Sequence, residues 1–318
     1  GLEYAGVLGR VYDQEGSLTE TKVLFDFNRP HLVLILGKTR QGKSYTMGVI
    51  AEELLKLNDQ LQKKVAAIIV DNMGIFHTMK YANVRESETS LLLEKYGTQP
   101  RGFDVKVFAP KEIPESSYNY ADAPLCVKPS ELSASDWAGV FEIDLNRPMG
   151  LLLYRVITSL KKDFGPAYDI PDILQRIEDD QRAGIETKEA LTNRIATSAE
   201  WGIFDSNTSI ISSLIRPGAF SVLDVSTFDY TATGWSVRSL IVGLIARRIM
   251  RARMHQRKRE ELRTLGRDIA NQDVNEIPMV WLLIDEAHMF LPRAALTNAT
   301  SPLLEWITQG QQPGLSLF

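Results

Sequence analysis

The stretch Gly37-Lys38-Thr39-Arg40-Gln41-Gly42-Lys43-Ser44 decides how this sequence folds. It matches the pattern G-x-x-x-x-G-K-[ST] at every fixed position, between an apolar run (residues 31–36) and a segment with helical periodicity (residues 42–57). Glycines in such a loop permit backbone angles that other residues resist, so the amides point at phosphate oxygens. The following helix adds free N–H groups and a positive dipole end. The motif therefore predicts a nucleoside triphosphate site.

The residues of this loop have different expected roles. Lys43 is expected to bridge the β- and γ-phosphates of ATP, and Ser44 to ligate Mg²⁺. The variable positions Thr39, Arg40 and Gln41 need only their backbones for phosphate contact. Tyr45 either lines the adenosine side or packs as an ordinary helix residue. The residues expected to bind the nucleotide are Gly37, Lys38, Thr39, Arg40, Gln41, Gly42, Lys43, Ser44 and Tyr45.

A pair of acids follows the apolar run at residues 279–284. A buried strand there would place Asp285 and Glu286 at its carboxyl end, where ligands of open α/β sheets bind. We expect Asp285 to hold Mg²⁺, mostly through water, and Glu286 to orient the attacking water or accept its proton. The alternative is a solvated acidic turn after a core strand.

Strand-like and helix-like blocks alternate along the chain, which favours an α/β fold with a mostly parallel central sheet. The run at 31–36 is expected to be a strand buried on both faces. Residues 4–12 and 22–27 suggest an N-terminal hairpin, and residues 111–214 a helical insertion. The other expected strands are 65–70, 105–108, 220–225, 279–284 and 315–318, and the expected insertion helices are 133–140, 149–160, 173–180 and 188–201.

The composition sets limits on the class of protein. The chain has 318 residues, of which 44% are hydrophobic, so a substantial core is expected. A net charge of −4 excludes a generally basic nucleic-acid surface but not a local basic patch. The single cysteine, Cys126, fits a packed core thiol and a reducing compartment, and we expect a cytoplasmic protein. No apolar segment approaches the ~18 residues that a membrane helix needs, and we expect a portion of a longer protein.

Three blocks resemble the HerA-type ATPases of the HerA/FtsK branch of P-loop motor proteins. They are residues 28–31 (Asn-Arg-Pro-His) leading into the loop, residues 285–292 (Asp-Glu-Ala-His-Met-Phe-Leu-Pro) and residues 308–316 (Thr-Gln-Gly-Gln-Gln-Pro-Gly-Leu-Ser). Residues 70–75 also resemble the second strand of that family, where Asp-Pro is more usual than Asp71-Asn72. The blocks span nearly the whole chain around a variable helical region.

The resemblance implies a RecA-like P-loop NTPase that hydrolyses ATP with Mg²⁺ as a hexameric ring. It implies a DNA translocase or helicase whose pore threads double-stranded DNA toward a partner nuclease or effector, in DNA repair or anti-phage defence. The expected division is residues 1–27 as a β segment left from a β-barrel, 28–110 and 215–318 as the ATPase core, and 111–214 as the insertion.

Two departures from the family pattern bear on function. Gln311 stands where related sequences often carry Arg, in a helix expected to approach a neighbour's nucleotide. If that Arg acts in trans, its role is lost or moves to Arg293 or Arg216. The polar residue expected after the sixth strand would lie beyond Phe318. Other expectations remain open: an ATP-controlled assembly scaffold that activates an effector, or a conjugation- or secretion-type ATPase at a membrane.

Three further features have two interpretations each. The helix that carries Arg247, Arg251 and Lys258 either neutralises DNA phosphates or is a solvated basic helix end. Asp71, expected to end a strand next to the loop's strand, contacts the magnesium shell or forms a turn before Gly74. His288 couples the site to a neighbour or caps local structure.

Overall fold

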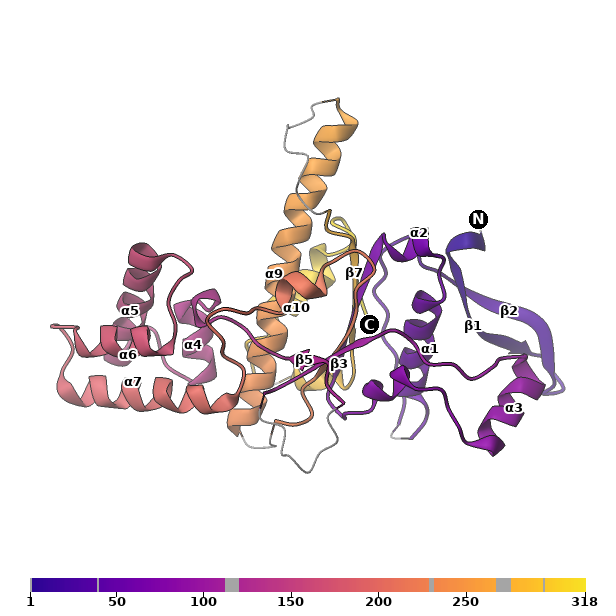
Figure 1. The fold of residues 1–318 in the computed structure, drawn as a ribbon, viewed down its shortest axis with the longest axis horizontal. Helices are drawn as coiled ribbons and strands as arrows, with labels where there is room; N and C mark the ends of the chain where they lie inside the picture. Colours follow the sequence, from indigo (N-terminus) through magenta and orange to yellow (C-terminus); the bar gives the residue numbers. More distant parts are fainter. Residues whose placement is uncertain (1, 39, 112–119, 229–231, 267–275, 294) are drawn as a thin grey trace.

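The computed structural model of the 318-residue chain describes residues 2–38, 40–111, 120–228, 232–266, 276–293 and 295–318. Its helices and strands alternate along the chain, as expected (Figure 1). The strands are β1 Ala5–Tyr12, β2 Leu18–Asp26, β3 Val65–Asp71, β4 Lys106–Ala109, β5 Ala123–Pro124, β6 Phe220–Asp224, β7 Met279–Ile284 and β8 Leu315–Leu317. The helices are α1 Lys43–Leu55, α2 Asp59–Gln62, α3 Glu86–Tyr96, α4 Ala134–Val140, α5 Pro148–Phe164, α6 Ile170–Glu178, α7 Ile185–Ser198, α8 Ile211–Leu214, α9 Ala232–Thr264 and α10 Thr300–Gln309.

The central sheet has the strand order β5-β4-β6-β3-β7-β8, and every neighbouring pair is parallel. Parallel pairing places all the carboxyl ends of these strands at one edge of the sheet. The hairpin β1–β2 forms a separate antiparallel sheet. The predicted α/β class with a mostly parallel sheet and a small N-terminal β segment is confirmed.

Alternate residues of each central strand face two separate cores. In β3, Ile68 and Val70 belong to the core that contains α9 and α10, whereas Ala67 and Ile69 belong to the core that contains α1. Because both faces are covered, β3 is buried along its whole length, which explains its continuous apolar sequence. The lone thiol of Cys126 is fully buried, as predicted.

The run at residues 31–36 differs from the expected strand. Only Leu32 forms a parallel bridge, to Leu317 of β8, and the amide of Val33 donates to the carbonyl of Leu317 at 2.9 Å. Leu34 and Leu36 are 76% and 80% exposed, while Val33 packs against the α1-side core. The prediction of burial on both faces is wrong, because within the described residues no helix covers the second face of this run.

The run also lies farther from β3 than expected. Two strands, β7 and β8, separate it from β3. Asp71 therefore does not end a strand next to the loop's strand, and that prediction is wrong. The β8 segment, which comes last in the chain, is inserted between the acid-bearing β7 and residues 31–36.

The N-terminal hairpin is longer than its apolar pattern suggests. β2 begins at Leu18 rather than residue 22. Its residues 20–24 are exposed, so the first part of the strand carries polar side chains and lacks the apolar pattern that would predict it. The carboxylate of Asp13 closes the turn by accepting hydrogen bonds from the amides of Glu15 (3.0 Å) and Ser17 (2.8 Å). These local hydrogen bonds fix the turn, so the hairpin does not depend on apolar side chains on both of its faces.

Helices α4 to α7 lie together at one end of the molecule, and the hairpin with α1 and α3 lies at the other (Figure 1). Ser133 is the N-cap of α4: its hydroxyl accepts from the Asp136 amide at 3.2 Å, and its own amide donates to the Asp136 carboxylate. The two-residue strand β5 was not predicted, since so short a segment carries no periodic pattern.

Replacing Gly243 by alanine is expected to destabilise the fold by about 1–3 kcal/mol. A Cβ there would overlap the backbone oxygen of Asn298, which packs against α9 just before α10 begins. Gly48→Ala is the matched control, because the nearest atom to a Cβ at Gly48 in α1 is 3.9 Å away. Urea unfolding should show a gain of roughly 0.5–1 kcal/mol for the control. Equal stability of the two variants would contradict this packing.

Candidate functional site

The loop after residue 36 leads directly into α1. Gly42 is the N-cap of α1 with φ +84° and ψ 17°, a left-handed conformation in which a Cβ is strained. Arg40 also has a positive φ of 65°. Gly37 has no positive φ, and a Cβ there would meet Lys43 Cγ at an ordinary 3.4 Å, so the expected reason for a glycine holds for Gly42 alone. The predicted contact residue Thr39 lies outside the described residues.

The loop and the acid pair come together at the carboxyl edge of the sheet. The hydroxyl of Ser44 donates to Oδ1 of Asp285 at 3.0 Å, across a sequence separation of 241 residues. Lys43 Nζ lies 4.0 Å from Oε1 of Glu286. Two segments that are distant in sequence thus place a hydroxyl, an ammonium and two carboxylates within one small region.

Strand β7 and a strained turn aim the two acids. The Asp285 amide donates to the Val70 carbonyl at 3.1 Å, so the acid begins where the β3–β7 ladder ends. Glu286 then adopts φ 52° and ψ 49°, a left-handed conformation that costs a non-glycine residue about 1–2 kcal/mol. His288 lies beside it, with Nδ1 3.2 Å from Glu286 Oε2. This contact is local in the chain, and coupling of His288 to a neighbour stays a prediction.

Burial raises the pKa of Asp285 above its ordinary value, and the neighbouring Glu286 carboxylate adds to the effect. The hydrogen bond from Ser44 and the charge of Lys43 oppose it. Oδ2 of Asp285 is buried and has no hydrogen-bond partner among the described residues. A buried carboxylate oxygen without a partner, next to a serine hydroxyl, suits a hard cation such as Mg²⁺.

Asn72 supports the acid pair, which sequence reasoning did not foresee. It is fully buried, and its Nδ2 donates to the backbone carbonyl of Asp285 at 2.6 Å. Its Oδ1 is also buried without a partner within the described part of the chain. The sequence signal for this role was Asn72 itself, which stands where the family more usually has proline. Proline has no side-chain donor, so it could not make this hydrogen bond.

Asp71 forms a turn rather than facing the acid pair. Its Oδ1 accepts from the amides of Met73 (3.1 Å) and Gly74 (2.8 Å), and its Oδ2 from the amide of Phe76 (2.7 Å). Burial raises its pKa, and the charge of Asp224 adds to this, while the amide hydrogen bonds oppose it. These bonds favour the turn-forming role that the sequence left open.

A second polar pair at this edge was also missed. Asp224 ends β6, in register with Asp71 of β3, and accepts a hydrogen bond from the hydroxyl of Tyr120. Burial raises the pKa of Tyr120, and the bond to Asp224 adds to it. The available signal for Asp224 was its place near the end of a predicted buried strand.

The remaining predicted residues lie around the site or away from it. Lys38, Arg40 and Gln41 are exposed, and Tyr45 is 67% exposed at the first turn of α1. Gln311 lies in the turn after α10 and not within a helix. Its carbonyl accepts a hydrogen bond from the Gly314 amide, which closes the turn before β8. That turn is at the amino edge of the sheet, opposite the loop. The candidate substitutes Arg216 and Arg293 are both exposed.

The basic part of α9 is engaged in the fold more than its sequence suggests. Arg253 is buried and donates to the Pro313 carbonyl at 2.7 Å, and Arg247 bonds to Asp136 of α4. Arg257 lies 3.3 Å from Glu261. Arg251 and Lys258 are exposed. Some of these cations therefore tie α9 to its neighbours.

Among the described residues, no helix has the length and apolarity needed to cross a membrane. The described residues also hold no group of three or more His, Cys, Asp or Glu side chains arranged for a metal ion. A magnesium ion bound mainly through phosphates, a hydroxyl and water does not need such a group.

Comparisons with known proteins place the chain in a family. Similar solved structures include VirB4 of Thermoanaerobacter pseudethanolicus (TM-score 0.49, 15% identity, 98% of this chain and 75% of that one). Another is the bacterial conjugative coupling protein TrwB (TM-score 0.45, 16% identity). That match covers 90% of this chain and 62% of the TrwB chain. No curated protein sequence matches. The family model described as "Helicase HerA, central domain" matches residues 7–249, which is most of the chain. The protein therefore belongs to the HerA central-domain family of HerA/FtsK-type P-loop ATPases.

Proposed function

We propose that this protein hydrolyses ATP with Mg²⁺ and uses the energy to move double-stranded DNA. The observation that carries the hydrolytic part is the hydrogen bond between Ser44 and Asp285, with Lys43 and Glu286 beside it. A loop hydroxyl, a loop ammonium and two strand-end carboxylates are the groups that phosphoryl transfer to water requires.

Each side chain has a defined task in this proposal. The amides of the loop and the start of α1 bind the phosphate chain, and Lys43 balances charge on the β- and γ-phosphates. Ser44 and Asp285 hold Mg²⁺, which when bound offsets the negative charge of the triphosphate. The unpartnered Oδ2 of Asp285 supports this assignment.

Glu286 orients the attacking water and accepts its proton as the new P–O bond forms. The bond from the γ-phosphorus to the bridging oxygen breaks, and the products are ADP and inorganic phosphate. The left-handed backbone of Glu286 supports this role, because strain of this kind persists where the surrounding structure fixes a side chain for function. His288, at 3.2 Å, steadies the carboxylate.

The DNA part of the proposal rests on family membership. We propose a homo-oligomer, a hexamer, in which residues 28–110 and 215–318 form the ATPase core and 111–214 the helical insertion. DNA would pass through the ring toward a partner nuclease or another effector in DNA repair or anti-phage defence, in the cytoplasm.

Added duplex DNA is expected to raise the rate of ATP turnover severalfold, because a translocase couples hydrolysis to movement along its track. The measurement is steady-state phosphate release with and without duplex, with Lys43→Ala protein as the background. Electron microscopy of the same sample with ATP should show six-membered rings with DNA in the pore. A turnover rate that does not respond to duplex would contradict translocation.

A second candidate function is an ATP-controlled scaffold that assembles and activates an effector with little translocation. The observation that favours it is Gln311, which is exposed and offers no cation to a neighbour's nucleotide. The Glu286→Gln protein separates the two functions. A scaffold would still activate its effector with ATP bound and unhydrolysed, whereas a motor would not.

A further inference from the structure

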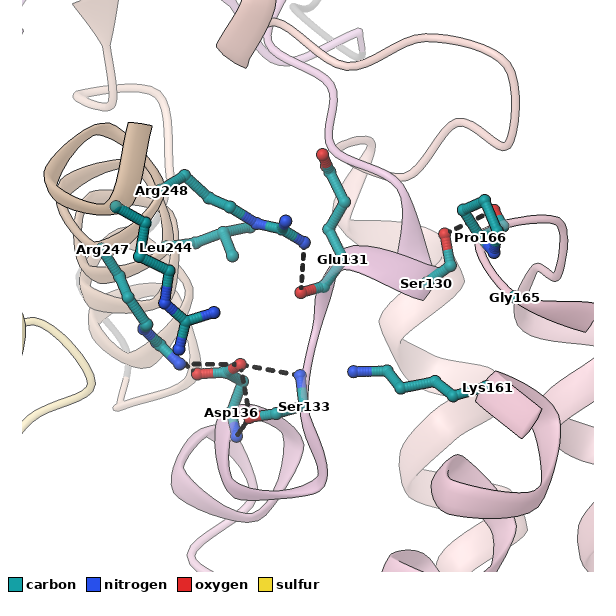
Figure 2. Close-up of a pocket in the computed structure, with 11 residues that line it drawn as sticks. Ser130, Glu131, Ser133, Asp136, Lys161, Gly165, Pro166, Leu244, Arg247 and Arg248 are labelled. Atoms are coloured by element: carbon teal, nitrogen blue, oxygen red, sulfur yellow. Dashed lines mark hydrogen bonds and ion pairs between the residues drawn. The ribbon is translucent and has the colours of Figure 1, made fainter. Parts of the chain in front are cut away.

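A concave, strongly basic pocket lies between α9 and the helices α4 and α5, away from the loop and the acid pair. Its volume is about 480 Å³. The cationic side chains that line it are Lys161 of α5 and Arg247, Arg248 and Arg251 of α9. Figure 2 shows Arg247 and Arg248 reaching in from α9 while Lys161 points toward them from the opposite wall. None of these residues belongs to the proposed ATP site.

Two of the arginines are held in fixed positions. Arg247 donates to both carboxylate oxygens of Asp136, at 2.6 and 3.2 Å, and Ser133 donates to the same carboxylate. Burial alone would raise the pKa of Asp136, but the hydrogen bonds from Arg247 and Ser133 outweigh it and hold this pKa below its ordinary value. Arg248 donates to the backbone carbonyl of Glu131 at 3.1 Å. The wall is thus organised before any ligand arrives.

The other two cations are not balanced in this way. Among the described residues, no carboxylate lies within ion-pair distance of Lys161 or Arg251, although both line the pocket. The Glu131 carboxylate, which also lines the pocket, accepts from the Lys128 amide and the Ser209 hydroxyl instead of pairing with either cation. Burial lowers the pKa of Lys161; the Asp136 carboxylate opposes this shift, and the charges of Arg248, Arg247 and Arg251 add to it. Asp136 and Glu131 together offset two of the four positive charges that line the pocket, and two remain unbalanced.

Positive charge that exceeds the negative charge of the lining residues favours an anionic ligand. Guanidinium groups bind phosphate oxygens through paired N–H groups, and an ammonium adds a point charge. The volume is within the range of small-molecule sites, about 300–1,000 Å³. Cations that converge from opposite walls suit a ligand that enters between them better than the convex surface of a DNA duplex.

We propose that this pocket binds a small ligand with two or more adjacent phosphate groups, at a site separate from the ATP site. The pocket lies between α9 and the helices α4 and α5, so a bound ligand would hold α9 and these two helices together. Asp136 contributes by orienting Arg247, and the ligand contacts fall to Lys161, Arg248 and Arg251.

The test is calorimetric titration of inorganic triphosphate into full-length Lys43→Ala protein, in which the loop binds phosphates weakly. The double variant Lys161→Ala/Arg251→Ala should bind at least about tenfold more weakly, since each lost charged hydrogen bond removes a substantial part of the affinity. The matched control, Lys162→Ala/Arg259→Ala, removes the same charge from the same two helices outside the pocket. The control should keep the parent affinity.

A charge-preserving double variant, Lys161→Arg/Arg251→Lys, should retain binding, which separates loss of a contact from loss of folding. Circular dichroism checks that all variants fold. Equal affinity for triphosphate in the pocket variant and its control would overturn the proposal. Loss of binding to a short duplex in the pocket variant, with triphosphate binding unchanged, would also overturn it and would assign these cations to DNA.

Discussion

Replacing Glu286 by glutamine is expected to lower the rate of ATP hydrolysis by a factor of about 10²–10⁴. Glutamine keeps the size of the side chain and occupies the same left-handed backbone position, but it cannot accept a proton from water. The Lys43 ammonium, 4.0 Å away, remains available to the triphosphate. Nucleotide binding should therefore stay near that of the parent protein.

The measurement pairs steady-state phosphate release with binding of a fluorescent ATP analogue. Glu305→Gln is the matched control, because it makes the same chemical change at an exposed position on α10. The control should hydrolyse ATP at the parent rate. A Glu286→Gln protein that retains more than about a tenth of the parent rate would remove Glu286 from the role of base.

Replacing Lys43 by alanine is expected to weaken binding of Mg²⁺·ATP by about ten- to a hundredfold, because hydrogen bonds to charged groups contribute about 1.5–3 kcal/mol. Hydrolysis should fall with it, since charge on the transferred phosphoryl group is no longer balanced. Lys38→Ala is the matched control in the same loop, because it removes the same charge from an exposed side chain that the motif does not require.

Titration of each variant with ATP in the presence of Mg²⁺ gives the comparison. The Lys38→Ala protein should bind ATP within about twofold of the parent, a difference below 1 kcal/mol. If the two alanine variants lost affinity equally, the loop would be acting through its overall charge rather than through one positioned ammonium.

The site was predictable where its chemistry is local in sequence. The loop ending in Ser44 and the acids at 285–286 have fixed spacings, and parallel pairing brings strand ends to one edge. Asn72 and Asp224 could not be found in this way. Their roles depend on which strands are neighbours, and the order β6-β3-β7 is a tertiary property.

The fold shows the same limit. Long apolar strands such as β3 and β7 were predicted well, whereas residues 31–36 have the same apolar character but an uncovered face at Leu34 and Leu36. An apolar run indicates that a segment packs against a core, but it does not indicate whether one or both faces of the strand are covered. The basic pocket was equally hidden, because Lys161 of α5 and Arg251 of α9 line one pocket only after α4 packs against both helices.

The most direct test of the account is an experimental structure with Mg²⁺ and a non-hydrolysable ATP analogue. We expect a triphosphate against the backbone of residues 37–44, a magnesium ion between the hydroxyl of Ser44 and the carboxylate of Asp285, and Glu286 facing the γ-phosphate. A nucleotide bound elsewhere, or one bound to the loop with Asp285 and Glu286 turned away from it, would contradict the account.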